Sequence, residues 1–246
     1  MVIPARLAAV RLPRKPLRLL AGLPLIVRVW QRVSSMKIAD KVIVATDDES
    51  VASAVRDAGA ECAMTSDTHT SGTERVAEVA RKAEFTDYST IVNVQGDEPF
   101  IGCEAIKGAA DLVSSKKFPI GTSASPASWD ISNNPNIVKV VRGNDGRALY
   151  FSRAAIPFPR DGADSIEMKP LQHIGVYAYS RDALENWISL PPSELETTER
   201  LEQLRPLAAG IPIGVAIATE PPAPGIDTEE DLSRANARWD AFIAGR

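Results

Sequence analysis

The sequence predicts an α/β fold in which a layered sheet carries helices on both faces. The first observation is that strand-like and helix-like segments alternate through the first half of the chain. The second is an apolar run at residues 91–94, suited to an interior strand, which ends in the motif QGDEP at residues 95–99. Gly96 lets the backbone turn sharply, so Asp97 and Glu98 should emerge at the carboxyl end of that strand, where ligands bind in open α/β sheets.

The composition is that of an ordinary globular protein. The chain has 246 residues, of which 44% are hydrophobic and 24% charged, which is enough for a large core. Its 28 basic and 32 acidic residues give a net charge of -4. Because a nucleic-acid-binding protein needs a broad basic face, this balance argues against such a partner, and any anion site must be local.

Cysteine usage and hydropathy predict a cytoplasmic protein that does not insert into a membrane. Cys62 and Cys103 lie far apart without a C-x-x-C spacing, and only His69 and His173 are available to complete a zinc site. We therefore expect two reduced cysteines. The chain contains no run of about 18 apolar residues and begins without the pattern of a signal peptide.

The first half of the chain contains most of the predicted alternation. Pro24 suits the first turn of a helix, Asp47 or Asp48 can cap the next helix, and Gly59 ends it. We predict strands at residues 2–4, 41–45, 61–64 and 91–94, and helices at residues 25–33, 49–58 and 73–83.

The second half is richer in strand-like segments. These lie at residues 120–127, 137–141, 148–151 and 173–179, so we predict one domain over residues 1–246 with a β-rich inserted region at about 118–180. Residues 157–170 are rich in Pro, Gly and Asp and should form an exposed loop. Helices are predicted at residues 181–188 and 196–208, a strand at 213–218, and a closing helix from Thr228.

Two motifs carry candidate chemistry. Asp97 offers hard oxygen ligands of the kind that Mg²⁺ takes, although Gly-Asp-Glu-Pro is equally typical of a turn with solvated acids. Residues 6–15 carry four cations, Arg6, Arg11, Arg14 and Lys15, on an otherwise acidic protein. Arginine forks and a lysine charge suit a triphosphate, but the P-loop pattern is absent, and a solvated basic loop is the alternative.

Six sequence blocks give a more specific indication. In chain order they are TSGTER (70–75), VNVQGDEP (92–99), NPNIVK (134–139), LYFSR (149–153), HIGVY (173–177) and LEQLR (201–205). Together with the basic loop they resemble the 3-deoxy-manno-octulosonate cytidylyltransferases, or CMP-Kdo synthetases, among the sugar nucleotidyltransferases. The resemblance extends over nearly the whole chain.

This resemblance implies a Rossmann-like three-layer nucleotidyltransferase fold with a mixed, mostly parallel sheet, in which the inserted region forms a homodimer contact. It also implies the transfer of CMP from CTP to the anomeric hydroxyl of 3-deoxy-D-manno-octulosonate (Kdo), with release of pyrophosphate, as a step toward lipopolysaccharide. Two alternatives stay open: a cytidylyltransferase for another acid sugar, such as an amino-substituted Kdo or a sialic acid, and a catalytically silent nucleotide-binding protein.

The resemblance also implies residue roles. Lys15, Asp97 and Asp227 would be catalytic, with Mg²⁺ held by the two aspartates, although Asp227 could instead be the N-cap of the last helix. CTP would be bound by Arg6, Arg11, Lys15, Ser71, Gly72 and Thr73. The acid sugar would be bound by Arg75, Gln95, Arg153, His173, Tyr177, Glu202 and Gln203.

Some of these residues have a simpler structural explanation. His173 beside Ile174 could be a core histidine, and Glu202 and Gln203 could belong to the polar face of a helix. The basic loop also departs from the family pattern. Arg14 stands where a glycine is usual, and Ala9 and Val10 replace hydroxyl-bearing residues, which leaves the path of the loop open.

Overall fold

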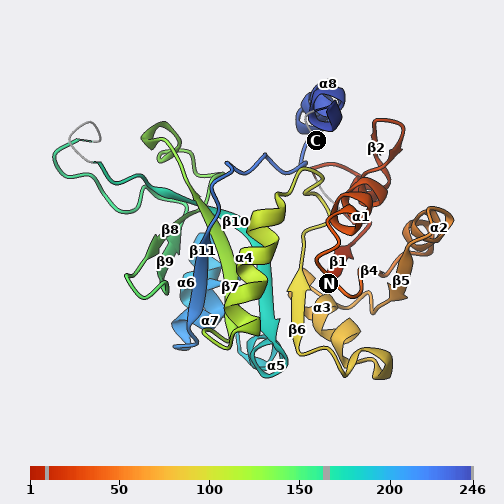
Figure 1. Cartoon of the computed structure of the whole chain (residues 1–246), viewed down its shortest axis with the longest axis horizontal. Coiled ribbons are helices and arrows are strands. Elements are labelled where there is room, and N and C mark those ends of the chain that lie inside the picture. Colours follow the sequence, from red (N-terminus) through yellow and green to blue (C-terminus); the bar gives the residue numbers. More distant parts are fainter. Residues whose placement is uncertain (9–10, 163–166, 245–246) are drawn as a thin grey trace. The chain divides into compact units, whose positions relative to one another are not determined.

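The computed structural model describes residues 1–8, 11–162 and 167–244 (Figure 1). The chain forms two compact units. The first unit comprises Met1–Asp87, Asn93–Ile101 and Ala223–Arg246, and the second comprises Tyr88–Val92 and Gly102–Pro222. The predicted β-rich region at 118–180 lies inside the second unit. Among the described residues, no helix is long and apolar enough to cross a membrane.

The first unit is built on a parallel sheet. Its strands are β1 (Val2–Ala5), β4 (Ile43–Thr46) and β5 (Glu61–Met64), in the order β1-β4-β5. Asn93 pairs with Val2 on the other side of β1. Every residue of β1 and β4 is buried, so both faces of these strands are covered, as the predicted α/β class requires.

Helices and short elements complete the first unit. They are η1 (Lys15–Leu17), β2 (Leu19–Leu20), β3 (Leu23–Pro24), α1 (Leu25–Ser35), α2 (Glu49–Asp57), α3 (Gly72–Arg81), η2 (Ala83–Phe85) and α8 (Glu229–Ala244). Local signals set several ends. The Asp48 side chain caps α2 by accepting from Ser50 N and Val51 N, and Ser71 and Glu74 form a capping box on α3.

The second unit contains a mixed sheet. Its strands are β6 (Thr90–Asn93, up to Val92 in this unit), β7 (Ile120–Pro126), β8 (Lys139–Arg142), β9 (Ala148–Ser152), β10 (Leu171–Ser180) and β11 (Ile213–Ile217). The order is β11-β7-β10-β6, with β8 pairing with β10 and β9. β11 runs parallel to β7, whereas β10 runs antiparallel to it, which agrees with the mixed sheet that the family resemblance implied.

The second unit also contains a helix to which the sequence analysis assigned no element, α4 (Cys103–Ser114). Two glycines allow it to approach the sheet closely. A Cβ added to Gly108 would lie 2.7 Å from the Cβ of Ala216, and one added to Gly121 would lie 2.2 Å from the carbonyl oxygen of Ala109. Gly108 lowers helix propensity, so the residue that enables this packing also weakens the sequence signal for α4.

The prediction of one helix over residues 196–208 is wrong. The remaining helices of the second unit are η3 (Trp129–Ile131), α5 (Arg181–Ser189), α6 (Glu194–Glu199) and α7 (Leu204–Ala208). Arg200 adopts a left-handed conformation with φ 53° and ends α6. Pro206 explains the break, because a continuous helix would place its ring against the carbonyl of Glu202 and would lose a hydrogen bond. The strand predicted at 61–64 matches β5, and the other predicted elements are present with shifted ends.

Arg14 occupies a backbone conformation that favours glycine. It precedes η1 with φ 55° and ψ 35°, in the left-handed region. A residue with a Cβ atom is disfavoured there by roughly 1–2 kcal/mol. The structure thus gives a physical reason why glycine suits this position of the loop.

We expect Arg14→Gly to raise the free energy of unfolding by about 0.5–1 kcal/mol, because the relief of the left-handed conformation outweighs the extra entropy of glycine in the unfolded chain. Urea denaturation measures this change. Arg14→Ala is the control, since it removes the charge but keeps the Cβ atom. If Arg14→Ala stabilised the protein as much as Arg14→Gly, backbone conformation would not be the cause.

Candidate active site

In the first unit, one ammonium group joins the two predicted metal ligands. Lys15 Nζ donates to Asp97 Oδ2 at 2.6 Å and to Asp227 Oδ1 at 2.9 Å. Lys15 opens η1, Asp97 lies in the turn after β6, and Asp227 lies just before α8. A backbone bond from Ile226 N to Asp97 O at 3.0 Å holds the two acidic segments together. The three predicted catalytic residues are therefore neighbours.

The charges of this cluster determine its protonation. Burial alone would lower the pKa of Lys15, but the two carboxylates outweigh burial and raise it above its ordinary value. Arg11 Nη2 also contacts the second oxygen of Asp227 at 2.9 Å, from a side chain that is 66% exposed. Both predicted metal ligands are thus paired with cations that the triphosphate of CTP would also attract.

Asp227 does not cap the last helix. Thr228 does so, because its Oγ1 accepts from Asp231 N at 3.1 Å while Asp231 Oδ2 accepts from Thr228 N at 2.9 Å. The carboxylate of Asp227 is therefore available to cations. The alternative of an N-cap role for this residue, which the sequence left open, does not hold in the structure.

Glu98 differs from its neighbour Asp97. Burial, and after it the charges of Asp97 and Asp227, raise the pKa of Glu98 to about 8. A Cβ added to Gly225 would lie 3.2 Å from Glu98 Oε1, so the chain packs closely against this carboxyl group. Glu98 is thus protonated at neutral pH. It therefore has a different role from Asp97 and Asp227, which accept hydrogen bonds from Lys15.

The residues of this cluster fit a magnesium ion. Two carboxylates already share one cation, and their combined charge contributes to the raised pKa of a third acid nearby. In the described part of the chain no group of three or more His, Cys, Asp or Glu side chains is arranged for a metal. A site with two carboxylates leaves positions for water and phosphate oxygens, which is how Mg²⁺ is usually held.

Two other cations of the basic loop are exposed to solvent. The side chain of Arg6 is exposed, and so is that of Arg14. Ala9 and Val10, which depart from the family pattern, lie outside the described residues. Of the cations predicted to bind triphosphate, Lys15 and Arg11 are thus joined to the acidic pair, whereas Arg6 faces solvent.

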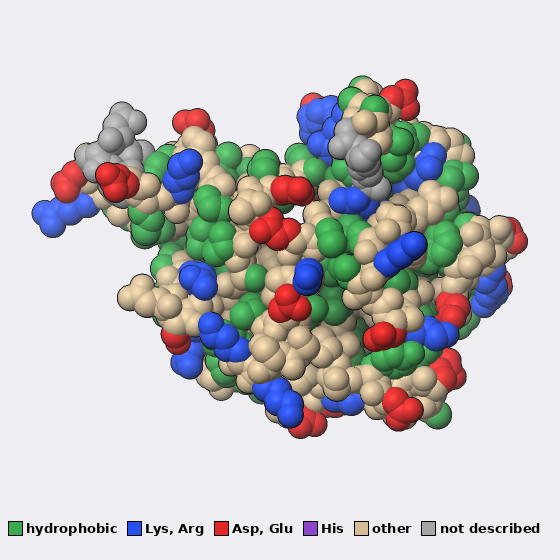
Figure 2. Space-filling view, viewed as in Figure 1, with side chains coloured by type: hydrophobic (Ala, Val, Ile, Leu, Met, Phe, Trp, Pro, Cys, Tyr) green, Lys and Arg blue, Asp and Glu red, His purple; other side chains and the backbone are tan. Residues whose placement is uncertain are grey.

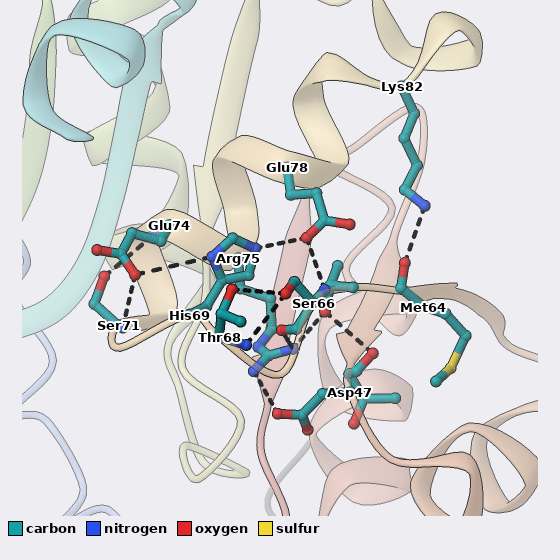
Figure 3. Close-up of polar contacts among 12 residues, drawn as sticks. Asp47, Met64, Ser66, Thr68, His69, Ser71, Glu74, Arg75, Glu78 and Lys82 are labelled. Atoms are coloured by element: carbon teal, nitrogen blue, oxygen red, sulfur yellow. Dashed lines mark hydrogen bonds and ion pairs between the residues drawn. The ribbon is translucent and has the colours of Figure 1, made fainter. Parts of the chain in front are cut away.

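The turn at residues 71–73, predicted to bind CTP, follows a loop that side chains of α3 hold in place (Figure 3). Glu78 Oε2 accepts from Ser66 N at 2.8 Å and pairs with His69 Nε2 at 2.5 Å. Glu74 Oε2 accepts from Thr70 N at 2.7 Å. These bonds from α3 position the backbone that leads into the capping residue Ser71.

The turn itself lies against β1. Thr73 is buried, and a Cβ added to Gly72 would lie 3.3 Å from Pro4 Cγ and 4.0 Å from Gln95 Oε1. A side chain at position 72 would therefore fit only tightly against Pro4. Gln95, predicted to bind the sugar, thus lies beside Gly72, which is predicted to bind CTP.

Arg75 is buried and has its hydrogen-bond partners within the first unit. Its side chain is 3% exposed, and Nη2 donates to Asp47 Oδ2 at 2.8 Å while Nη1 donates to Thr65 Oγ1 and to Ser66 O (Figure 3). The guanidinium thus joins the end of β4 to the loop before α3. Asp47 was not predicted as a functional residue, although a carboxylate directly after a strand was the available signal.

In the second unit, Arg153 is held by backbone carbonyls. Its guanidinium donates to Glu199 O at 2.8 Å, to Pro135 O at 2.9 Å and to Arg200 O at 3.4 Å. The carboxylate of Glu199 accepts from Arg153 N at 2.9 Å and from Ser152 Oγ at 2.6 Å. Glu199 was missed as well, because nothing local in the sequence distinguishes it from other acids of α6.

Two other predicted sugar-binding residues, His173 and Tyr177, belong to a cluster of packed aromatic rings. His173 packs edge-on against Phe151 at 5.0 Å between ring centroids and lies 5.5 Å from Tyr177. Burial lowers the pKa of His173 to about 3. Burial, and then the charges of Tyr179 and Glu202, raise the pKa of Tyr177 well above its ordinary value. Both side chains are thus neutral at physiological pH.

Gln203 is 5% exposed and sits just before α7, and Glu202 acts electrostatically on Tyr177. The second unit thus brings His173, Tyr177 and Glu202 together. The helix-face explanation for Glu202 and Gln203 does not hold, because neither lies within α6 or α7.

The parallel α/β layer, with a basic loop after its first strand and an acidic turn, defines a nucleotidyltransferase fold. The chain belongs to the cytidylyltransferase family, whose model matches residues 1–213. Within it, the chain belongs to the 3-deoxy-manno-octulosonate cytidylyltransferases. It is 56% identical to such an enzyme from Gemmatimonas aurantiaca over 247 aligned positions, covering 99% of this chain and 95% of that protein.

Comparison with solved structures supports the same family and fold. A CMP:2-keto-3-deoxy-manno-octonic acid synthetase complexed with CTP matches with a TM-score of 0.90 and 38% identity, covering 98% of this chain and 97% of that one. A 4-diphosphocytidyl-2C-methyl-D-erythritol synthase from Anaerococcus prevotii has a TM-score of 0.61, and HddC from Yersinia pseudotuberculosis has one of 0.66. Each covers 97% of this chain and is 14% identical, so both show the fold alone.

We expect Glu98→Gln to remove a pH dependence of stability when no divalent metal is added. The folded protein keeps the Glu98 proton up to pH about 8, whereas the unfolded chain loses it near pH 4.5. Folding therefore takes up a proton in this window, and this group makes the free energy of unfolding fall as pH rises, by at most about 1.4 kcal/mol per pH unit.

Urea denaturation at pH 5, 6.5 and 8 tests this. Glu98→Gln should gain stability relative to wild type as pH rises, whereas Glu84→Gln, at an exposed position of η2, should follow wild type. A constant difference between Glu98→Gln and wild type across the three pH values would show that Glu98 does not titrate in this window.

Proposed function

We propose that this protein transfers CMP from CTP to the anomeric hydroxyl of Kdo and releases pyrophosphate, as a step toward lipopolysaccharide. The observation that carries the proposal is the contact of Lys15 with both Asp97 and Asp227, in a chain 56% identical to a named 3-deoxy-manno-octulosonate cytidylyltransferase. In this reaction the sugar oxygen attacks the α-phosphorus, the bond to the β-phosphate breaks, and the hydroxyl proton is lost.

Charge neutralisation and positioning are the main requirements of such a transfer. Asp97 and Asp227 are the residues that would hold Mg²⁺, which when bound would neutralise charge on the phosphates. Lys15 and Arg11, already at these carboxylates, are positioned to bind triphosphate oxygens, and Arg6 can add a fork from its exposed position.

The base and the sugar are assigned to separate groups of residues. Ser71, Gly72 and Thr73 bind the cytidine part, with the loop before them held by Glu74 and Glu78. The acid sugar is bound by Arg75, Gln95, Arg153, His173, Tyr177, Glu202 and Gln203. Some of the donors of Arg75 and Arg153 already hold neighbouring groups of the protein, and the remaining N–H groups of each guanidinium are the ones that would meet the sugar.

We expect pyrophosphate release with CTP, Mg²⁺ and Kdo, and at least about tenfold lower kcat/KM with an amino-substituted Kdo or a sialic acid. Asp97→Asn should lower the rate by about 100-fold or more, because a charge that stabilises the transition state is lost, with little change in the unfolding midpoint. Asp240→Asn, at an exposed site of α8, is the matched control.

The outcomes separate the alternatives. A preference for another sugar acid would assign a different acceptor, and CTP binding without pyrophosphate release from any sugar would indicate a silent nucleotide-binding protein. Near-wild-type turnover of Asp97→Asn, or full activity in excess chelator, would contradict the magnesium role.

We also propose a cytoplasmic homodimer that uses the region 118–180. Large apolar side chains are exposed there, with Leu149 58%, Phe158 79% and Met168 54% accessible. Figure 2 shows hydrophobic side chains at the surface of this part of the second unit. Exposed apolar side chains in one region are typical of a protein contact, and a second copy is the partner that the family resemblance implies.

Phe158→Asp should weaken dimerisation by about 30-fold or more, since a central aromatic residue typically contributes about 2 kcal/mol to an interface. Light scattering after size exclusion measures the mass. Ile243→Asp, at an exposed position of α8, is the control. A monomeric wild-type protein, or dissociation caused by Ile243→Asp alone, would contradict the assigned surface.

A further inference from the structure

The pairing of β7 and β10 is interrupted beside His173. Thr122 pairs with Tyr177 and Ser123 with Ile174, so residues 175 and 176 have no partner on β7. Such a bulge removes backbone groups from the ladder and turns side chains in new directions. The carbonyl groups of the bulge therefore need hydrogen bonds from elsewhere.

The hydroxyl of Thr122 supplies one such bond, to the carbonyl of Val176. The residue is fully buried, and its Oγ1 lies 2.7 Å from Val176 O, 3.3 Å from Ile174 O and 2.9 Å from His173 Nε2. A hydroxyl has one hydrogen, and carbonyl oxygens only accept. The hydrogen must therefore point to the carbonyls, with Val176 the nearer, and Oγ1 can meet His173 only as an acceptor.

This assignment places the proton on the histidine ring. Because Oγ1 accepts, Nε2 must carry a hydrogen, and because burial keeps the ring neutral at physiological pH, Nδ1 carries none. His173 keeps some accessible surface, and within the described residues the only hydrogen bond of its ring is the one to Thr122. Nδ1 is thus an acceptor to which no described residue donates.

We propose that Thr122 is a positioning residue that holds His173 as the tautomer with hydrogen on Nε2, so that Nδ1 accepts a hydrogen bond from a hydroxyl of the acceptor sugar. The ligand part of this inference rests on the proposed function, whereas the tautomer does not. A neutral acceptor cannot bind a carboxylate, which also only accepts. His173 therefore recognises a hydroxyl, and the carboxylate of the sugar is bound by other groups.

Nuclear magnetic resonance of protein with ¹⁵N-labelled histidine tests the tautomer directly. The chain has only two histidines, so comparison with His69→Gln assigns the signals of His173. Wild type should show a protonated Nε2 and a bare Nδ1 between pH 6 and 8. Adding Kdo should shift the Nδ1 signal and leave the proton on Nε2. A proton on Nδ1, or a charged ring in this range, would overturn the proposal.

Kinetics of Thr122→Val and Thr122→Ser test the positioning. Thr122→Val should raise KM for Kdo about five- to tenfold, the effect of one lost hydrogen bond, with KM for CTP within about twofold of wild type. Its His173 signals should show both tautomers. Thr122→Ser keeps the hydroxyl and should restore the wild-type tautomer and KM for Kdo.

The results distinguish this proposal from a structural role and from failure of the proposed function. Equal rises of KM for both substrates, or a single Nε2-protonated tautomer in Thr122→Val, would contradict positioning by Thr122. If Thr122→Val did not fold, three measurements would still test the proposal. These are the tautomer in the wild-type spectrum, its response to Kdo, and the tautomer and KM of Thr122→Ser. The expected tautomer without any pyrophosphate release would instead refute the proposed function alone.

Discussion

The bond of one ammonium to two carboxylates is the interaction on which the candidate active site depends. Lys15 lies 82 residues from Asp97 and 212 residues from Asp227 along the chain, so the contact joins three distant segments. Without a cation the two carboxylates would repel each other, and after burial their charges are the next causes that raise the pKa of Glu98. Because Thr228 caps α8, the carboxylate of Asp227 remains available for this pairing.

The cationic side chains of the family motifs fall into two groups, exposed side chains that are open to a ligand and buried ones that hold the backbone. Arg6 and Arg11 are exposed, as phosphate-binding groups should be. Lys139, in contrast, is fully buried, and its Nζ donates to three backbone carbonyls, at 2.5 Å for Arg153 O, 2.7 Å for Ile137 O and 3.1 Å for Asn134 O. A buried charge needs such partners, so residues of this kind shape the site without being open to a ligand.

The elements with local signals were predictable. The Asp48 cap, the Ser71 capping box and the glycine that ends α2 act within a few residues, so they could be read directly. The break between α6 and α7 also had a local cause in Pro206, which the predicted helix ignored. α4 had no such local signal, because Gly108 is explained only by the close approach of this helix to the sheet.

From the amino-acid order alone came the α/β class, the acidic turn after the central strand, the basic loop and the family, because each depends on short patterns and their sequence along the chain. Tertiary structure decided which groups meet: Asp227 with Lys15 rather than with its helix, and Thr122 with His173. These contacts join residues that are far apart in the chain. Their protonation depends on burial and on neighbouring charges, which exist only once the chain has folded.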